Sequence, residues 1–212
     1  MSATSEPEIP HVITAPKSAF ASVEPREPVF RYQPFGPAEP VKHYLVVATY
    51  NENVAWAAMH RGWWNLQIVR KDVDVANKGR EASSYLWWIV QNYDKLRDGD
   101  HVAFVQGNPY DHCPQFDEYL RGGVLFGPTL ACDRDGFPHH GGLRASIDKG
   151  REIFSIHSTW ELRFVAGAQF MVNGRTILSH DKSKYERALE WSMEDKDAPW
   201  AMERLWCAIF KL

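Results

Sequence analysis

The sequence predicts an α/β fold in which a mostly parallel sheet is flanked by helices. Between residues 43 and 105, short apolar runs rich in β-forming residues alternate with segments of helical character. A broad apolar stripe at helical spacing lies within this region, and two amphipathic segments end the chain. Strands that alternate with helices favour right-handed crossover connections, so we expect neighbouring strands of the sheet to run parallel.

The first strand is expected at residues 43–49 (HYLVVAT), a short apolar run bounded by polar residues and proline. A short helix is expected at residues 53–61, with Asn51 or Asn53 as its cap. Residues 66–70 (LQIVR) form the second expected strand.

The longest helix is predicted at residues 82–96, where large apolar side chains recur every three or four positions. The stripe consists of Tyr85, Leu86, Ile89, Val90, Tyr93 and Leu96. Trp87 and Trp88 widen it, so we expect a helix that is covered on most sides. The third strand is expected at residues 101–105.

The region 106–163 is rich in Gly, Pro and His and has weak periodicity, which predicts loops with small additional elements. The apolar run 164–172, around Gly167, predicts a further strand. Two amphipathic helices follow, one at residues 183–193 and one at the end of the chain. The last helix has an apolar face made of Met202, Leu205, Trp206, Ile209 and Phe210.

The composition separates residues 1–40 from the rest, because 8 of the 13 prolines fall there. We expect a disordered or extended N-terminal tail at 1–40 and one α/β domain at 41–212. The chain has 24 basic and 27 acidic residues, so no global field draws it to nucleic acid or to an anionic membrane. Three widely spaced cysteines and the lack of a long apolar run predict a cytoplasmic protein without a membrane span.

Three polar clusters follow predicted strands or open the long helix: residues 48–53 (ATYNEN), 77–81 (NKGRE) and 106–112 (QGNPYDH). In an open parallel sheet, ligands bind outside the carboxyl ends of the strands, where such loops gather. Each cluster taken alone is also typical of an ordinary turn.

The cluster at residues 77–81 carries the most specific prediction, an anion site. Gly79 allows the backbone to approach a ligand, and Arg80 supplies a forked donor that suits phosphate. The start of a helix adds partial positive charge. The alternative is a capped helix in which Arg80 pairs with Glu81 or with a nearby acid.

The order of these motifs resembles the nucleotide-sugar-binding half of GT-A glycosyltransferases: a strand ending in VATYNE, then NKGRE before a long helix, then a strand into a polar loop. Residues 79–112 are similar to an uncharacterised domain family common in fungi and related to those enzymes. Residues 164–172 and 202–206 are similar to later blocks of the same family. The resemblance covers residues 43–212 and implies a single Rossmann-like domain of the GT-A type.

The resemblance implies a nucleoside diphosphate sugar as donor substrate. The residues it places on the nucleoside are Thr49, Tyr50 and Asn51, and those it places on ribose or diphosphate are Asn77, Gly79 and Arg80.

The resemblance also implies Mn²⁺ or Mg²⁺, which GT-A enzymes hold on the diphosphate with an Asp-X-Asp motif in the third loop. That motif is absent here, and Asp111 with His112 are the metal ligands that the loop offers. The alternative is a turn-forming Asp and a packed His.

A literal Asp-X-Asp does occur at Asp133 and Asp135, but Gly136 follows it, which is typical of a hairpin turn. The alternative is a ligand-binding or acceptor loop to which His139 or His140 adds a metal ligand.

Acceptor-binding groups and a general base are implied for the segment that precedes residues 164–172. His157 and Glu161 are the candidates for deprotonating an acceptor hydroxyl, and Trp160 for stacking on a sugar. An edge strand with half-buried aromatic residues is the alternative. Glu203 and Arg204 in the last helix are expected to form a fixed ion pair.

The sequence therefore favours a nucleotide-sugar-dependent glycosyltransferase whose acceptor is a hydroxyl group of a glycan, a small molecule or a modified nucleic acid. The first alternative is a catalytically degenerate module that binds a nucleotide or a protein. The second is a metal-dependent hydrolase that uses Asp111, His112, Asp133 and His139 or His140. The sequence leaves the oligomeric state open.

Overall fold

A computed structural model describes residues 40–157 and 161–212 of the chain. The predicted tail, apart from Pro40, and Trp160 lie outside the described residues. The strands are β1 (His43–Thr49), β2 (Asn65–Arg70), β3 (His101–Gln106), β4 (Thr129–Asp133), β5 (Glu161–Val165) and β6 (Phe170–Asn173). The α-helices are α1 (Arg80–Asn92), α2 (Phe116–Tyr119), α3 (Arg144–Phe154), α4 (Gly174–Leu178), α5 (Lys182–Glu194) and α6 (Ala198–Phe210). Short 3-10 helices are η1 (Ala55–His60), η2 (Tyr93–Lys95) and η3 (Pro109–Asp111).

The main sheet has four strands in the order β2-β1-β3-β6 and is mostly parallel, as predicted. β1 pairs in parallel with β2 and β3, whereas β6 is antiparallel to β3. Thr49 is in register with Arg70, and Ala48 with Gln106. The three parallel strands therefore end together, and the residues that follow them share one edge of the sheet.

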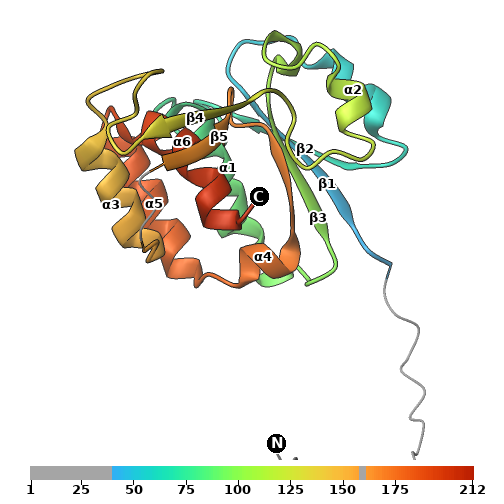
Figure 1. The fold of residues 1–212 in the computed structure, drawn as a ribbon. Coiled ribbons are helices and arrows are strands. Elements are labelled where there is room, and N and C mark those ends of the chain that lie inside the picture. Colours follow the sequence, from blue (N-terminus) through green and yellow to red (C-terminus); the bar gives the residue numbers. More distant parts are fainter. Residues whose placement is uncertain (1–39, 158–160) are drawn as a thin grey trace, which may run out of the picture. The chain divides into compact units, whose positions relative to one another are not determined.

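Helices cover both faces of this sheet. The longer helices α1, α5 and α6 lie on one face, and α2 with η1 lies over the other (Figure 1). The alternating side chains of β1 contribute to both layers: Tyr44 and Val46 belong to the core under the long helices, and Leu45 and Val47 to the smaller core under α2. Burial on both faces explains why residues 43–49 are a continuous apolar run.

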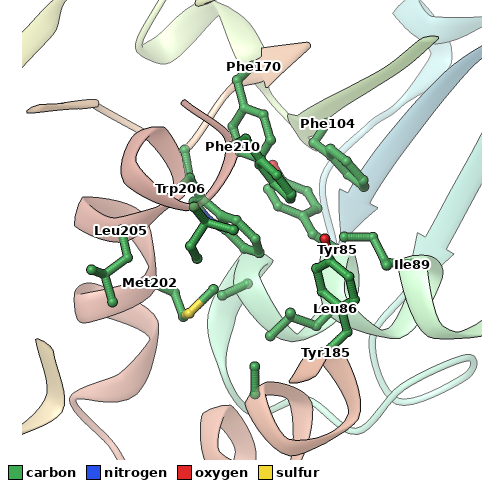
Figure 2. Packing of buried hydrophobic residues seen from close by; sticks show 14 of the residues in the cluster. Tyr85, Leu86, Ile89, Phe104, Phe170, Tyr185, Met202, Leu205, Trp206 and Phe210 are labelled. Atoms are coloured by element: carbon green, nitrogen blue, oxygen red, sulfur yellow. The ribbon is translucent and has the colours of Figure 1, made fainter. Parts of the chain in front are cut away.

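Aromatic side chains fill the larger core (Figure 2). Trp206 stacks on Phe210 at 5.6 Å between ring centroids, and Phe170 lies 5.4 Å from Trp206. Where α1 packs on the sheet, the ring centroids of Tyr85 in α1 and Phe104 in β3 lie 5.0 Å apart. All five side chains are almost fully buried, and each contributes about 1.5–3 kcal/mol of hydrophobic stabilisation.

The predicted apolar face of α6 is confirmed, and that of the long helix is confirmed in part: α1 ends at Asn92, before Tyr93 and Leu96, and Trp87 and Val90 are only partly buried. Met202, Leu205, Trp206, Ile209 and Phe210 are all buried, with at most 2% of each exposed. The helix predicted at residues 53–61 is the shorter 3-10 helix η1. Asn53 still acts at its start, because its Oδ1 accepts a hydrogen bond of 3.0 Å from the Ala55 N–H.

The strand predicted at residues 164–172 is wrong in one respect: the run divides between β5 and β6, which lie in different sheets. The chain turns at Gly167 and Ala168, whose φ angles are +79° and +51°. The Ala168 N–H donates to the Val165 carbonyl oxygen, which closes the turn. Gly167 is a local signal for such a turn, whereas Ala168 is not, because alanine rarely adopts a positive φ.

The Gly167 turn rests on the predicted ion pair of α6. Glu203 Oε1 accepts a 2.8 Å hydrogen bond from the Gly167 N–H, and Glu203 Oε2 lies 2.5 Å from Arg204 Nη1. Both side chains are nearly buried, so the pair is a structural element of the core.

The region 106–163 contains α3, which the sequence did not reveal. Its buried face includes the small residues Ser146 and Gly150 beside Ile147, Ile153 and Phe154. A face built partly from small residues gives little hydrophobic periodicity, which is why residues 144–154 escaped prediction.

None of the helices in residues 40–157 and 161–212 combines the length and the apolar character needed to cross a bilayer.

Candidate functional site

A cavity of about 310 Å³ lies where the three parallel strands end. It is lined by Ala48, Thr49, Tyr50, Glu52, Lys71, Asn77, Arg80, Glu81, Gln106, Gly107, Asn108 and Asp111. All three polar clusters identified in the sequence contribute to this lining, because the loops after β1 and β3 and the start of α1 share one edge of the sheet. Its volume falls at the lower end of the range of about 300–1,000 Å³ for ligand pockets.

Another hollow, of about 340 Å³, lies beside α2 and is lined by Gln115, Glu118, Tyr119 and Gly123. It contains none of the predicted site residues and no cationic side chain. We therefore place the candidate site at the strand ends.

The loop after β1 is fixed by Glu52. Its Oε2 accepts hydrogen bonds of 2.9 Å from Thr49 Oγ1 and 2.7 Å from the Tyr50 N–H. Burial acts to raise the pKa of Glu52, but hydrogen bonds from Tyr50, Glu52 and Asn51 N–H groups and from Thr49 outweigh it and lower that pKa. Tyr50 is half exposed and lines the cavity, whereas Asn51 does not.

The start of α1 has an unusual backbone that directs Arg80 to the cavity. Gly79 and Arg80 both have positive φ angles, +71° and +47°. A Cβ on Gly79 would come within 2.7 Å of the Ser192 carbonyl oxygen and 2.8 Å of Ser83 Cβ, so only glycine fits. Gly79 does not line the cavity itself; it allows the chain to turn so that Arg80 does.

The Arg80 side chain combines the two predicted alternatives. Its Nε lies 3.5 Å from Glu81 Oε2, as expected for a helix-start ion pair. The side chain nevertheless lines the cavity and is 50% exposed. Its Cζ also lies 4.2 Å from the ring centroid of Trp200, a cation–π contact with α6.

Lys71 is a cavity residue that the sequence reasoning missed. It follows β2 directly, and its N–H donates to the Thr49 carbonyl oxygen across the sheet edge. Burial lowers the pKa of Lys71, opposed by the nearby carboxylate of Glu81. The available signal was its position: the residue after the second predicted strand had to lie at the same edge as the first and third loops.

Glu81 is the deepest acidic group of the site. Its side chain is 9% exposed, and burial raises its pKa, opposed by the Arg80 guanidinium. The cavity thus carries two cations, Lys71 and Arg80, and three acidic groups, Glu52, Glu81 and Asp111. Glu52 and Glu81 are already engaged by Thr49, Tyr50 and Arg80.

The predicted metal pair is not brought together at the cavity. Asp111 lines it, and Asp111 Oδ1 accepts a 2.8 Å hydrogen bond from Asn108 Nδ2. The His112 ring lies elsewhere, against the Cα of Gly167, where a Cβ would come within 2.6 Å of the imidazole. Within the described ranges, no three His, Cys, Asp or Glu side chains gather as metal ligands. These donors do not fit a preformed Mn²⁺ or Mg²⁺ site.

The Asp-X-Asp motif at Asp133 and Asp135 forms a turn. Asp133 Oδ1 accepts hydrogen bonds from the N–H groups of Asp135 and Phe137, at 2.8 and 3.0 Å. The turn does not close a hairpin, because α3 follows it before β5 pairs with β4. The histidines of this loop contact aromatic rings: His139 packs against Phe164, and His140 stacks on Trp200.

His157 and Glu161 do not line the cavity. Both side chains are exposed. Glu161 Oε1 lies 3.7 Å from Nε of Arg163, which is exposed as well. Trp160, the third member of this group, is outside the described residues. Their roles toward an acceptor stay predictions.

Residues 45–118 match a family described as "Protein of unknown function (DUF3431)". The match extends from β1 to α2 and includes every residue that lines the cavity. This agrees with the resemblance to an uncharacterised domain family. No curated protein and no solved structure showed significant similarity to the chain.

Proposed function

We propose that the cavity at the ends of β1, β2 and β3 binds a nucleoside diphosphate sugar, and that the protein transfers the sugar to a hydroxyl acceptor. The observation that carries the proposal is the convergence of three separate loops on one cavity containing Lys71 and Arg80. A diphosphate requires cationic donors, and a guanidinium beside an ammonium group supplies them.

Neutral groups of the lining suit the rest of such a ligand. Thr49, Asn77 and Gln106 offer hydroxyl and amide groups for ribose and base. Tyr50 offers a half-exposed ring on which a base can stack. Glu81 lies 3.5 Å from Arg80 Nε, so the terminal guanidinium nitrogens are the donors assigned to the diphosphate.

The proposal does not assign a metal step, since the donors present do not form a ligand set. Glu52 is held by Thr49 and Tyr50, and Asp111 by Asn108. The charge of the diphosphate is assigned to Lys71 and Arg80.

Calorimetric titration of UDP, GDP and their sugars, each with and without Mn²⁺, tests the proposal. Arg80→Ala should weaken binding by about 1–3 kcal/mol if the guanidinium holds phosphate. Arg175→Ala is the matched control, because Arg175 is an exposed arginine in a surface ion pair with Asp98. Absence of binding by every nucleotide would refute the proposal.

A binding module without transfer activity is the second candidate. It is favoured by the positions of His157 and Glu161, neither of which lines the cavity. Nucleotide binding without transfer or hydrolysis of any donor sugar would support this candidate. We do not propose a metal-dependent hydrolase, because the ligands it needs do not gather within the described ranges.

A further inference from the structure

We propose that Trp200 is a positioning residue that holds the Arg80 guanidinium as a preformed anion receptor at the cavity. This inference rests on the proposed function in one respect, namely that the anion is the diphosphate of a nucleotide. Trp200 lies in α6, far along the chain from the three loops that line the cavity.

Two contacts fix the guanidinium in different directions. Arg80 Cζ lies over the Trp200 ring, 4.2 Å from the ring centroid, so the indole supports the guanidinium from α6. The carboxylate of Glu81 lies 3.5 Å from Arg80 Nε and fixes one edge. An arginine side chain that is half exposed is ordinarily free to rotate, and these contacts remove that freedom before a ligand arrives.

The same contacts leave the terminal donors available. Within residues 40–157 and 161–212, Arg80 Nη1 and Nη2 make no hydrogen bond. A cation–π contact engages the face of the indole ring and needs no N–H donor, so the guanidinium keeps its terminal N–H groups in a fixed fork for a ligand. Such a fork matches two oxygens of one phosphate group.

Trp200 is itself held in place by its neighbours. Its carbonyl oxygen accepts a 3.0 Å hydrogen bond from Arg204 Nη1, and its ring stacks on His140 with centroids 4.8 Å apart. The indole is therefore packed between α6 and the loop after β4. The family match at residues 45–118 does not include Trp200, so the anion receptor depends on a part of the chain beyond that match.

A double-mutant cycle on Arg80 and Trp200 tests the proposal, with UDP and inorganic pyrophosphate as probes and calorimetry as the measurement. We expect Trp200→Leu to weaken binding of both probes about 3- to 10-fold, and Trp200→Phe to retain most of the affinity. In the Arg80→Ala background, Trp200→Leu should cause no further loss, because its effect acts through the guanidinium.

Circular dichroism and thermal unfolding of each variant show whether the fold is kept. If Trp200→Leu does not fold, Trp200→Met, whose flexible unbranched side chain adapts better to an irregular space, takes its place in the cycle. A merely structural Trp200 would weaken binding equally with and without Arg80, and that result, or unchanged affinity in Trp200→Leu, would overturn the proposal.

The two probes separate this inference from the proposed function. Pyrophosphate binding that depends on Arg80 and Trp200, without binding of UDP or GDP, would sustain the anion receptor and refute nucleotide binding. Binding of UDP that depends on Arg80 but is indifferent to Trp200 would refute only the positioning role. If wild type binds neither probe, both proposals fail.

Discussion

Glu52 lies directly against Gly107: a Cβ on Gly107 would come within 2.9 Å of both Glu52 Cβ and Glu52 Oε2. The loop after β3 thereby supports the carboxylate that fixes the loop after β1 through Thr49 and Tyr50. The Gly107 carbonyl oxygen also accepts a 2.8 Å hydrogen bond from Trp56 Nε1, so the glycine backbone has little freedom to move away. The two loops that line the cavity from β1 and β3 are interdependent at this contact.

Gly107→Ala should therefore destabilise the protein through its contact with Glu52. The added methyl displaces Glu52, which loses its hydrogen bonds with Thr49 and Tyr50. We expect a loss of about 1–2 kcal/mol in the free energy of unfolding, measured by urea denaturation. Gly122→Ala is the control, because nothing lies within 4 Å of a Cβ there. Equal effects of the two substitutions would show that the Glu52 contact does not matter.

The buried carboxylate of Asp100 should make part of the free energy of unfolding depend on pH. Its side chain is 1% exposed and accepts hydrogen bonds from the N–H groups of Lys42 and Arg97 and from Arg97 Nη2, at 3.0, 3.1 and 3.3 Å. Burial acts to raise the pKa of Asp100, but these donors outweigh burial and hold the pKa below its ordinary value of 3.8. A lowered pKa in the folded state means that the stabilisation is complete above 3.8 and is lost as the pH falls through the folded value.

Asp100→Asn should lower the free energy of unfolding by about 2–3 kcal/mol at neutral pH. The difference from wild type should shrink on acidification below the ordinary pKa of 3.8. Asp98→Asn, which removes an exposed partner of Arg175, should cost less than about 1 kcal/mol. Chemical denaturation across the pH range measures both variants, and a pH-independent difference for Asp100→Asn would contradict the prediction.

The charge of Lys71 should contribute to the affinity of the cavity for anions. Lys71→Met keeps much of the side-chain volume and removes the charge, so binding of UDP or pyrophosphate should weaken by about 1.5–3 kcal/mol. Because burial lowers the pKa of Lys71, wild-type affinity should begin to fall with rising pH below the ordinary lysine value of 10.5. Lys149→Met, at an exposed lysine of α3, should leave the calorimetric titration unchanged. If both variants bind alike, Lys71 has no role in the site.

Much of this site could be predicted because parallel strands end at one edge. Residues 43–49 and 101–105 are apolar runs bounded by turn residues, and once they pair in parallel, the loops that follow them must meet. Thr49 and Asp111 were found in this way, and Arg80 was found as a cation at the start of the long helix; all three line one cavity.

The other features of the site have no local signal in the sequence. Trp200 reaches Arg80 only because α6 packs on the same side of the sheet as α1, which no spacing near Arg80 reveals. Lys71 is a single cation after a strand, and such residues are ordinarily solvated. The separation of Asp111 and His112 has another cause: the two side chains diverge in the loop, and His112 packs on the Gly167 turn formed much later in the chain.

The close contact between α3 and α6 yields the last prediction. A Cβ on Gly150 would come within 2.4 Å of Leu205 Cδ1 and 3.1 Å of Trp191 Cη2, and all three residues are buried. Gly150→Ala adds a helix-favouring residue, which at an exposed site would stabilise a helix by about 1 kcal/mol. Here overpacking should dominate and lower the free energy of unfolding by about 1–3 kcal/mol. In a Leu205→Ala background, which vacates that space, the same substitution should cost less or become stabilising in urea denaturation; additive costs would show that α3 does not pack on α6 at Gly150.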